Sequence, residues 1–327
     1  MNRVRGKTDP DNGHGGRVFK GMINVGVIGV GSIGKHHARI FSNLEGVRLV
    51  GIVDADFPRA EEFAQKYNCK AFKDYLKIMD SVDAVSIAVP TTFHFQVAMD
   101  FLRHNKNILV EKPITSTLEE AETLTAEAEK RNLILQVGHL ERFNAGVSMI
   151  SGMVDKPQFI ESQRLSPFLG RGTDVDVTLD LMIHDIDIIL SLVKSEITDI
   201  RATGARVLTE NIDVAHAWIE FENGCIAESV TSRIANEKIR QLKVFQHNLF
   251  MNLDYQKQEL TCYTKLDDSV GKEIKKTEEK EPLKEQLVSF IECVKNGTQP
   301  LVSGHEGKEA LKIALKISEL VNHNFNI

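Results

Sequence analysis

A glycine-rich loop between an apolar run and a helical pattern constrains the fold of this chain more than any other feature of its sequence. Residues 23–28 form a short β-branched run, the loop GVGSIG follows directly at 29–34, and a helical pattern continues to about residue 44. The pattern G-x-G-x-x-G is weak by itself, because glycines also serve ordinary turns. Its place between a strand and a helix predicts the phosphate-binding turn of a dinucleotide-binding domain.

Each glycine of this loop is expected for a different physical reason. Gly29 permits a tight turn, Gly31 lets the backbone approach a pyrophosphate, and Gly34 lets the helix pack closely on the strand. The N-terminus of the helix then attracts the phosphate groups. We therefore expect this loop to hold the pyrophosphate of a dinucleotide.

An acidic residue stands where such a domain binds the adenosine ribose. Asp54 ends the next apolar run, about 20 residues beyond the last glycine of the loop. Its carboxylate should accept hydrogen bonds from the ribose hydroxyls and repel a 2′-phosphate, which favours NAD over NADP. Arg59 would soften this preference if it reached the ribose, but we expect it to be a surface charge on a helix.

The first half of the chain alternates strand-like and helical patterns. Further apolar runs lie at 47–53, 83–89, 107–110 and 133–137, with helical patterns between them. The last of these helices is expected to begin with a capping box of Ser116 and Glu119. Continuous apolar strands that alternate with helices are typical of a parallel sheet covered on both faces. The fold class is therefore α/β, with a doubly wound Rossmann domain over residues 22–141.

The second half has a different character. Residues 217–230 alternate apolar and polar side chains around the dipeptide Asn-Gly at 223–224, a strong hairpin signal. Strand-like patterns continue over 241–253 and 259–264, and an amphipathic helix is expected at 306–321. The charged segment 267–286 is expected to be a solvated loop entering a helix.

These patterns predict a second domain, α+β with a mostly antiparallel open sheet, over residues 142–327. An open sheet exposes a large apolar face unless another subunit covers it. We therefore expect a homodimer or homotetramer that associates through this sheet.

Composition and charge limit the partners. The 327 residues carry 40 Lys+Arg against 46 Asp+Glu, a net charge of −6, with no dominant basic block, so neither nucleic acid nor a membrane is an expected partner. The four cysteines lack CxxC spacing, so we expect no metal site or disulfide framework and a cytoplasmic location. Residues 1–21 show no signal or transit peptide pattern and are expected to be disordered.

Two polar residues lie four apart in an otherwise apolar segment. In the stretch DVTLDLMIHDID, Asp180 and His184 would share one face of a helix. A histidine with a pKa near ~6.5 suits the removal of a hydroxyl proton, and a nearby carboxylate can orient it. From the residues alone, a capping or core histidine is about as plausible as a catalytic one.

A third polar motif, Glu111-Lys112-Pro113, follows an apolar strand at the carboxyl edge of the predicted sheet. Ligands of open α/β sheets bind outside that edge. A lysine there can hydrogen-bond a substrate oxygen and stabilise the charge that develops on it.

With these motifs together, the chain resembles the Gfo/Idh/MocA family of oxidoreductases over nearly all of residues 22–321. The resemblance rests on GVGSIGKHHA, on Val89-Pro90 followed by His94, on EKP, on Asp180-x-x-x-His184 and on the tail GTQPLVSGHEGKEALKIALKIS. It implies a two-domain dehydrogenase in which nicotinamide and substrate meet between the domains.

The resemblance also implies roles for individual residues. The catalytic set would be Lys112, Asp180 and His184. The NAD cofactor would be bound by Gly29, Gly31, Ser32, Ile33, Gly34, Asp54, Pro90, His94, Glu111 and Lys112. The substrate would be bound by Lys112, Arg142, Asn144 and His184. Apart from the resemblance, the arginines Arg164 and Arg171 could bind a diphosphate bidentately, so we include them as substrate-binding candidates. For Arg142 and Asn144 a structural role in the interdomain hinge is equally plausible, and for Arg164 and Arg171 an unpaired surface position is the commoner explanation.

Within the family, the stretches VGHLERFNA and RLSPFLGRGTDVDVTLDLMIHDIDIIL look closer to bacterial sugar-nucleotide 3-dehydrogenases than to inositol or glucose dehydrogenases. This implies oxidation of the 3-hydroxyl of UDP-N-acetylglucosamine, to give a 3-keto sugar for transamination in lipid A or surface-glycan synthesis. The alternatives are an inositol or free-sugar dehydrogenase, an NAD-dependent glycosidase and a non-catalytic NAD-binding regulator.

Overall fold

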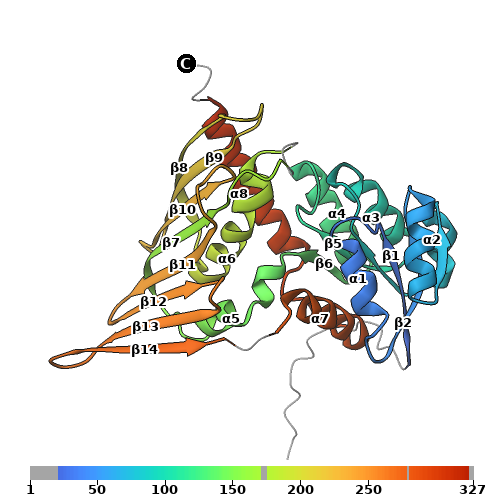
Figure 1. The fold of residues 1–327 in the computed structure, drawn as a ribbon, viewed down its shortest axis with the longest axis horizontal. Coiled ribbons are helices and arrows are strands. Elements are labelled where there is room, and N and C mark those ends of the chain that lie inside the picture. The colour runs from blue at the N-terminus through green and yellow to red at the C-terminus, as the bar shows by residue number, and fades with distance from the viewer. Residues whose placement is uncertain (1–20, 171–174, 278–279, 324–327) are drawn as a thin grey trace, which may run out of the picture.

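Two sheets, each covered by helices, stand side by side in the computed structural model (Figure 1). The structure describes residues 21–170, 175–277 and 280–323. Within these ranges no helix is long and apolar enough to cross a bilayer. The predicted α/β class, a parallel sheet followed by a mostly antiparallel one, is confirmed.

The first sheet has six parallel strands in the order β3-β2-β1-β4-β5-β6. They are β1 (Ile23–Ile28), β2 (Val47–Val53), β3 (Lys70–Phe72), β4 (Ala84–Ile87), β5 (Asn107–Glu111) and β6 (Leu135–Gly138). The order reverses at β1, which places the glycine loop at the switch point of a doubly wound sheet. The short β3 and the following 3₁₀ helix η1 (Tyr75–Ser81) were not predicted, because three residues are too few to show a pattern.

Helices cover both faces of this sheet. They are α1 (Gly34–Phe41), α2 (Phe57–Lys66), α3 (His94–Arg103) and α4 (Leu118–Lys130), with a 3₁₀ turn η2 (Thr91–Phe93) before α3. The capping box of α4 uses Thr117 and Glu120, one residue later than predicted from Ser116 and Glu119. A late helix, α7 (Pro282–Asn296), returns to pack beside α1 and buries Leu287 and Phe290 against the first sheet (Figure 1).

The second sheet has eight strands in the order β14-β13-β12-β11-β7-β10-β9-β8. They are β7 (Pro157–Leu165), β8 (Ile197–Ala205), β9 (Val214–Phe221), β10 (Ile226–Ser232), β11 (Ile239–Gln246), β12 (Leu249–Asp254), β13 (Glu259–Lys265) and β14 (Val270–Lys276). The predicted hairpin is β9–β10, and β10 pairs with β7 as the only parallel neighbours among the described strands of this second sheet. Residues 270–276 form β14 rather than the expected loop, because charged side chains suit an exposed edge strand.

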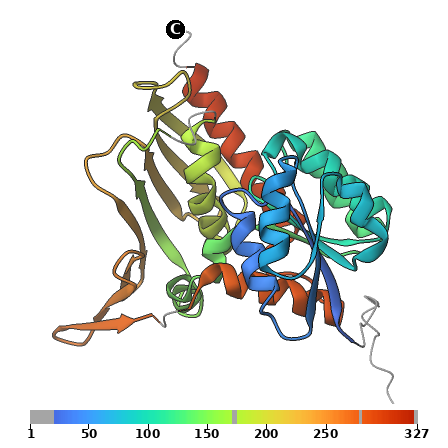
Figure 2. The ribbon, with the colours of Figure 1, turned by 45° about the vertical axis from the view of Figure 1, so that its right-hand side comes forward.

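One face of the second sheet is covered and the other carries no helix of the described chain (Figure 2). The covering layer consists of α5 (Ala145–Ser151), a π-helical turn η4 (Thr178–Met182), α6 (Ile183–Val193) and α8 (Gly304–His323). Alternate strand residues, such as Ile160, Val244 and Met251, are buried against this layer. The layer also brings α6 to the carboxyl edge of the first sheet, near the 3₁₀ helix η3 (Leu140–Phe143).

Candidate active site

The glycine loop has the shape that phosphate binding needs. Gly29 has a φ of +89°, and a Cβ there would lie 2.6 Å from the carbonyl oxygen of Ala88. A Cβ on Gly34 would lie 1.9 Å from the carbonyl oxygen of Gly29, so helix and strand pack too closely for any side chain. At Gly31 a Cβ would meet nothing within 4 Å, which leaves open space above the loop.

Helix α1 begins at this loop without a side-chain cap. Ile33 occupies the N-cap position and makes no capping hydrogen bond. The first N–H groups of a helix need partners from outside it, and a phosphate satisfies them while interacting favourably with the helix dipole. The loop and helix therefore fit the pyrophosphate of a dinucleotide.

Asp54, at the end of β2, is tied to the same loop. Its Oδ2 accepts a hydrogen bond from the backbone N–H of Val30 at 2.9 Å, and its Oδ1 accepts one from the backbone N–H of Asp56 at 2.9 Å. Arg59 donates to both oxygens, from Nη2 at 2.7 Å and from Nε at 3.2 Å. Burial alone would raise the pKa of Asp54, but these hydrogen bonds, led by that from Arg59, lower it below its ordinary value.

Arg59 is a surface charge on helix α2, as expected, and it is also the partner of Asp54. Its guanidinium is partly exposed, with 44% of the side chain accessible. A cation and a carboxylate thus stand together where the adenosine ribose of a dinucleotide would bind.

The predicted cofactor residues of the next strands are largely buried. His94 is 1% exposed, and its ring nitrogens contact the carbonyl oxygens of Pro113, at 2.8 Å, and Val89, at 2.9 Å. Pro90 directly precedes the η2 turn, which leads into His94 at the start of α3. His94 thus links the end of β4 to the EKP turn after β5.

Glu111 has a buried partner that the sequence did not indicate. Its Oε1 lies 3.4 Å from Nε2 of His37, whose Nδ1 lies 2.6 Å from the Ser86 hydroxyl. His37 is fully buried, whereas the adjacent His36 is exposed. The helical period would have separated these adjacent residues, one facing the sheet and one facing solvent.

Lys112 and Asp180, which are 68 positions apart in the sequence, meet at the carboxyl edge of the first sheet. The Lys112 Nζ donates to Asp180 Oδ1 at 3.1 Å and to the Asp180 carbonyl oxygen at 2.6 Å. Asp180 belongs to the π-helical turn η4, and such turns are common at functional sites. Lys112 therefore contacts both the carboxylate and the backbone of this turn.

His184 lies at the start of α6, close to this pair. Its Nδ1 is buried without a hydrogen-bond partner in the described chain. Burial, followed by the positive charges of Lys112 and Arg164, holds the pKa of His184 well below its ordinary value. The imidazole is therefore neutral at pH 7 and able to accept a proton.

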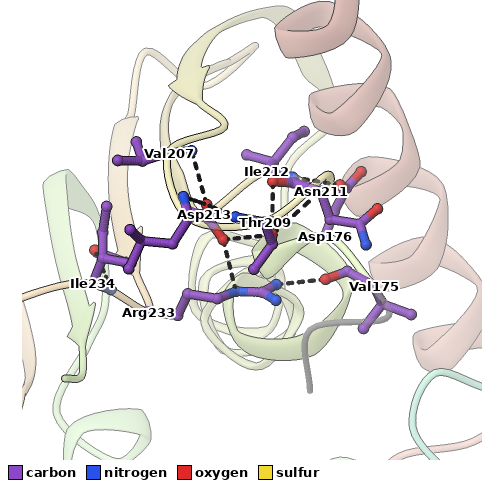
Figure 3. A network of polar contacts seen from close by, with 11 residues as sticks. Val175, Asp176, Val207, Thr209, Asn211, Ile212, Asp213, Arg233 and Ile234 are labelled. Carbon is purple, nitrogen blue, oxygen red and sulfur yellow. Dashed lines mark hydrogen bonds and ion pairs between the residues drawn. The ribbon is translucent and has the colours of Figure 1, made fainter. Parts of the chain in front are cut away.

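A polar network anchors the segment that leads into Asp180 (Figure 3). The fully buried Asp213 carboxylate accepts hydrogen bonds from three consecutive backbone N–H groups and from the Thr209 hydroxyl. Arg233, beside it, donates to the Val175 carbonyl oxygen, and Asp176 accepts from a backbone N–H of the same loop. These contacts fix the backbone at residues 175–176, directly before the π-helical turn η4.

Two predicted substrate residues make structural contacts. Arg142, in η3, donates from Nη1 to Asp187 Oδ1 at 3.2 Å, and burial raises the pKa of Asp187 to about 7 although Arg142 acts to lower it. Asn144 caps α5 by accepting from the Gly146 N–H at 2.9 Å. These contacts favour the hinge role over direct substrate binding.

Arg164 is buried rather than exposed, which corrects the expectation of an unpaired surface arginine. It donates bidentately to Asp185, both distances being 2.9 Å, and from Nη1 to Glu141 at 3.1 Å. All three residues are less than 9% exposed. Its donors are thus occupied, which favours a structural role over binding a diphosphate. Arg171 lies outside the described residues.

Comparisons with known proteins show which proteins this chain is similar to. Residues 23–139 match the Gfo/Idh/MocA profile described as an oxidoreductase family with an NAD-binding Rossmann fold, and residues 147–246 match the profile of the family's C-terminal domain. The chain is 32% identical to a UDP-N-acetylglucosamine 3-dehydrogenase of Acidithiobacillus ferrooxidans, over 90% of this chain and 96% of that one.

A solved structure of that enzyme superimposes with a TM-score of 0.88, covering 92% of this chain and 98% of the other. A scyllo-inositol 2-dehydrogenase (NAD(+)) of Bacillus subtilis is 26% identical, over 90% of this chain and 92% of the relative.

Proposed function

Because the chain belongs to the Gfo/Idh/MocA family of oxidoreductases, we propose that it is an NAD-dependent dehydrogenase that oxidises the 3-hydroxyl of UDP-N-acetylglucosamine. The product would be a 3-keto sugar nucleotide, ready for transamination. One observation carries the proposal: Lys112, Asp180 and a neutral His184 lie together at the carboxyl edge of the same parallel sheet that carries the glycine loop. The substrate is suggested by the 32% identity to a UDP-N-acetylglucosamine 3-dehydrogenase.

His184 acts as the general base in this proposal. A neutral imidazole can take the proton of the sugar hydroxyl as the hydride leaves the same carbon. Bound NAD would accept the hydride. The loop at 29–34 and Asp54 would hold it, together with Pro90, His94 and Glu111 near the ends of β4 and β5. The proton would leave from the hydroxyl oxygen and the hydride from the carbon that carries it, so a carbonyl would remain.

Lys112 stabilises the oxygen that gives up its proton. Its ammonium already donates two hydrogen bonds to Asp180, and a third N–H remains for a substrate oxygen. A fixed cation beside the developing oxyanion lowers the barrier because it needs no reorganisation during the reaction. Asp180 positions the lysine.

The proposed substrate is tested by the absorbance of NADH formed from NAD and a panel of UDP-sugars, with inositol and glucose alongside. A ketone trap or a coupled aminotransferase should draw the reaction forward. We expect NADH with UDP-N-acetylglucosamine. Turnover of a free polyol alone would refute the nucleotide-sugar substrate, sugar release without net NADH would indicate a glycosidase, and NAD binding without any reaction would indicate a regulator.

Cofactor preference should depend on the Asp54–Arg59 pair. We expect wild-type protein to prefer NAD, and Asp54→Asn to lower the ratio of NAD to NADP affinity roughly tenfold, because the charge that repels a 2′-phosphate is lost. Arg59→Ala, the matched control, should move the ratio toward NAD. Calorimetric titration of both cofactors measures the ratio, and equal ratios in all three proteins would contradict this role.

The open face of the second sheet is proposed to bind a second copy of the chain. Five aromatic rings cross this face from β9 to β13, with centroid separations of 4.5–6.1 Å along the series Trp218, Phe159, Phe245, Phe250 and Tyr263. Light scattering should give the mass of a dimer or tetramer, and Phe245→Asp with Phe250→Asp should give a monomer. A monomeric wild type at micromolar concentration would refute the interface.

A further inference from the structure

A buried histidine beside the proposed base has no partner. His139 directly follows β6, is 1% exposed, and neither of its ring nitrogens has a hydrogen-bond partner in the described chain. A buried polar group without a partner destabilises the folded protein. Such a cost in an enzyme site suggests that the partner is a bound ligand.

The neighbours of His139 place it at the reacting centre. Glu111 pairs with Gly138 across β5 and β6, so Lys112 and His139 are the next residues on adjacent strands. The rings of His139 and His184 meet edge to face, with centroids 6.0 Å apart and planes at 82°. A ligand held by Lys112 and His184 would therefore also lie beside His139.

The sheet order favours the substrate over the cofactor as this ligand. The glycine loop follows β1, whereas β6 is the edge strand, three places along in the order β1-β4-β5-β6. His139 thus lies on the far side of Lys112 from the dinucleotide loop, toward α6 and the second sheet. The missing hydrogen-bond partner of its ring nitrogens is therefore expected to be the substrate rather than the cofactor.

Its protonation state suits a hydroxyl. Burial, followed by the charges of Lys112 and Arg142, lowers the pKa of His139 to about 3. A neutral imidazole carries one donor and one acceptor, and a sugar hydroxyl offers the complementary acceptor and donor.

We propose that His139 hydrogen-bonds the hydroxyl on the carbon next to the one that is oxidised, and so selects the sugar. The inference rests on the proposed function. For UDP-N-acetylglucosamine oxidised at C3, this hydroxyl is the 4-hydroxyl, because C2 carries the acetamido group.

The test compares two substrates in two variants. His139→Leu should lower kcat/KM for UDP-N-acetylglucosamine roughly 10- to 100-fold, and His139→Gln, which keeps a donor and an acceptor, should recover part of that loss. With the 4-deoxy substrate, wild type and His139→Leu should be about equal, since the hydroxyl that His139 binds is gone. An equal loss on both substrates, or no loss on either, would overturn the proposal.

Stability separates this role from a structural one. Because leucine removes an unsatisfied polar group, His139→Leu should keep or raise the thermal midpoint while activity falls. A lowered midpoint together with equal losses on both substrates would indicate a packing role. NAD affinity should be unchanged.

Failure of the proposed substrate would be recognised separately. Wild-type protein that is inactive on UDP-N-acetylglucosamine but oxidises inositol would refute that substrate. The same comparison, made with inositol and the analogue lacking the neighbouring hydroxyl, would then decide the role of His139.

Discussion

Replacing His184 by alanine should lower kcat about 10²–10⁴-fold, because the reaction loses its general base. Lys112→Ala should lower kcat about 10²–10³-fold, since a fixed donor to the developing oxyanion is lost. Neither side chain lies in the glycine loop, so the affinity for NAD measured by calorimetry should change little with His184→Ala. Steady-state NADH formation gives both kinetic effects.

The pH dependence provides a second signature of His184. Burial and the nearby cations lower its pKa, so the base stays neutral at pH 7 and becomes protonated only at lower pH. The acid limb of kcat/KM should therefore lie below the ordinary histidine value of ~6.5. This limb should be absent from the residual activity of His184→Ala.

A matched control is available in His104, an exposed histidine at the end of α3. His104→Ala should leave kcat, KM and the pH profile unchanged. Near-normal turnover in both His184→Ala and Lys112→Ala would reject the assignment of these residues.

Arg164→Met should cost about 3–5 kcal/mol of the free energy of unfolding, because it removes the cation that pairs with the buried carboxylates of Asp185 and Glu141. Glu141 then keeps only Arg240, whose Nη1 lies 3.8 Å from its Oε1. Chemical denaturation at neutral pH measures this loss. Adding Asp185→Asn to Arg164→Met should cost less than the sum of the two single changes, since the second removes a charge that the first left unpaired.

The loss of unfolding free energy caused by Arg164→Met should grow as pH rises. Burial already raises the pKa of Asp185, and without Arg164 nothing adjacent would offset this effect as strongly. A carboxyl whose folded-state pKa exceeds its unfolded value binds more protons when folded, so stability falls as pH rises toward the folded-state pKa. A pH-independent loss below 1 kcal/mol would show that the network contributes little.

The Rossmann domain was predictable because its determinants are local. The loop at 29–34 lies between a strand and a helix, and the spacing to Asp54 is fixed by the βαβ unit. The hairpin around Asn223-Gly224 was predictable for the same reason. The capping box moved by one residue, from Ser116 to Thr117, because neighbouring hydroxyl residues offer equivalent caps and only the chain geometry chooses.

The contacts of Arg164 could not be derived in this way. Its partners Asp185 and Glu141 lie 21 and 23 positions away, on a helix and a 3₁₀ turn that only the tertiary fold brings to β7. The alternation of β7 does place Arg164 on the same face as Ile160, so an inward direction was available from the pattern. The pattern does not show which carboxylates would pair with this arginine.

The most direct test of the proposed reaction follows the hydride itself. Purified protein would be given NAD and UDP-N-acetylglucosamine deuterated at C3, and the NADH formed would be analysed by mass spectrometry. The account predicts deuterium in the NADH from the C3-labelled sugar and none from a C4-labelled one. NADH without deuterium from the C3-labelled sugar, or no NADH in the presence of a ketone trap, would contradict it.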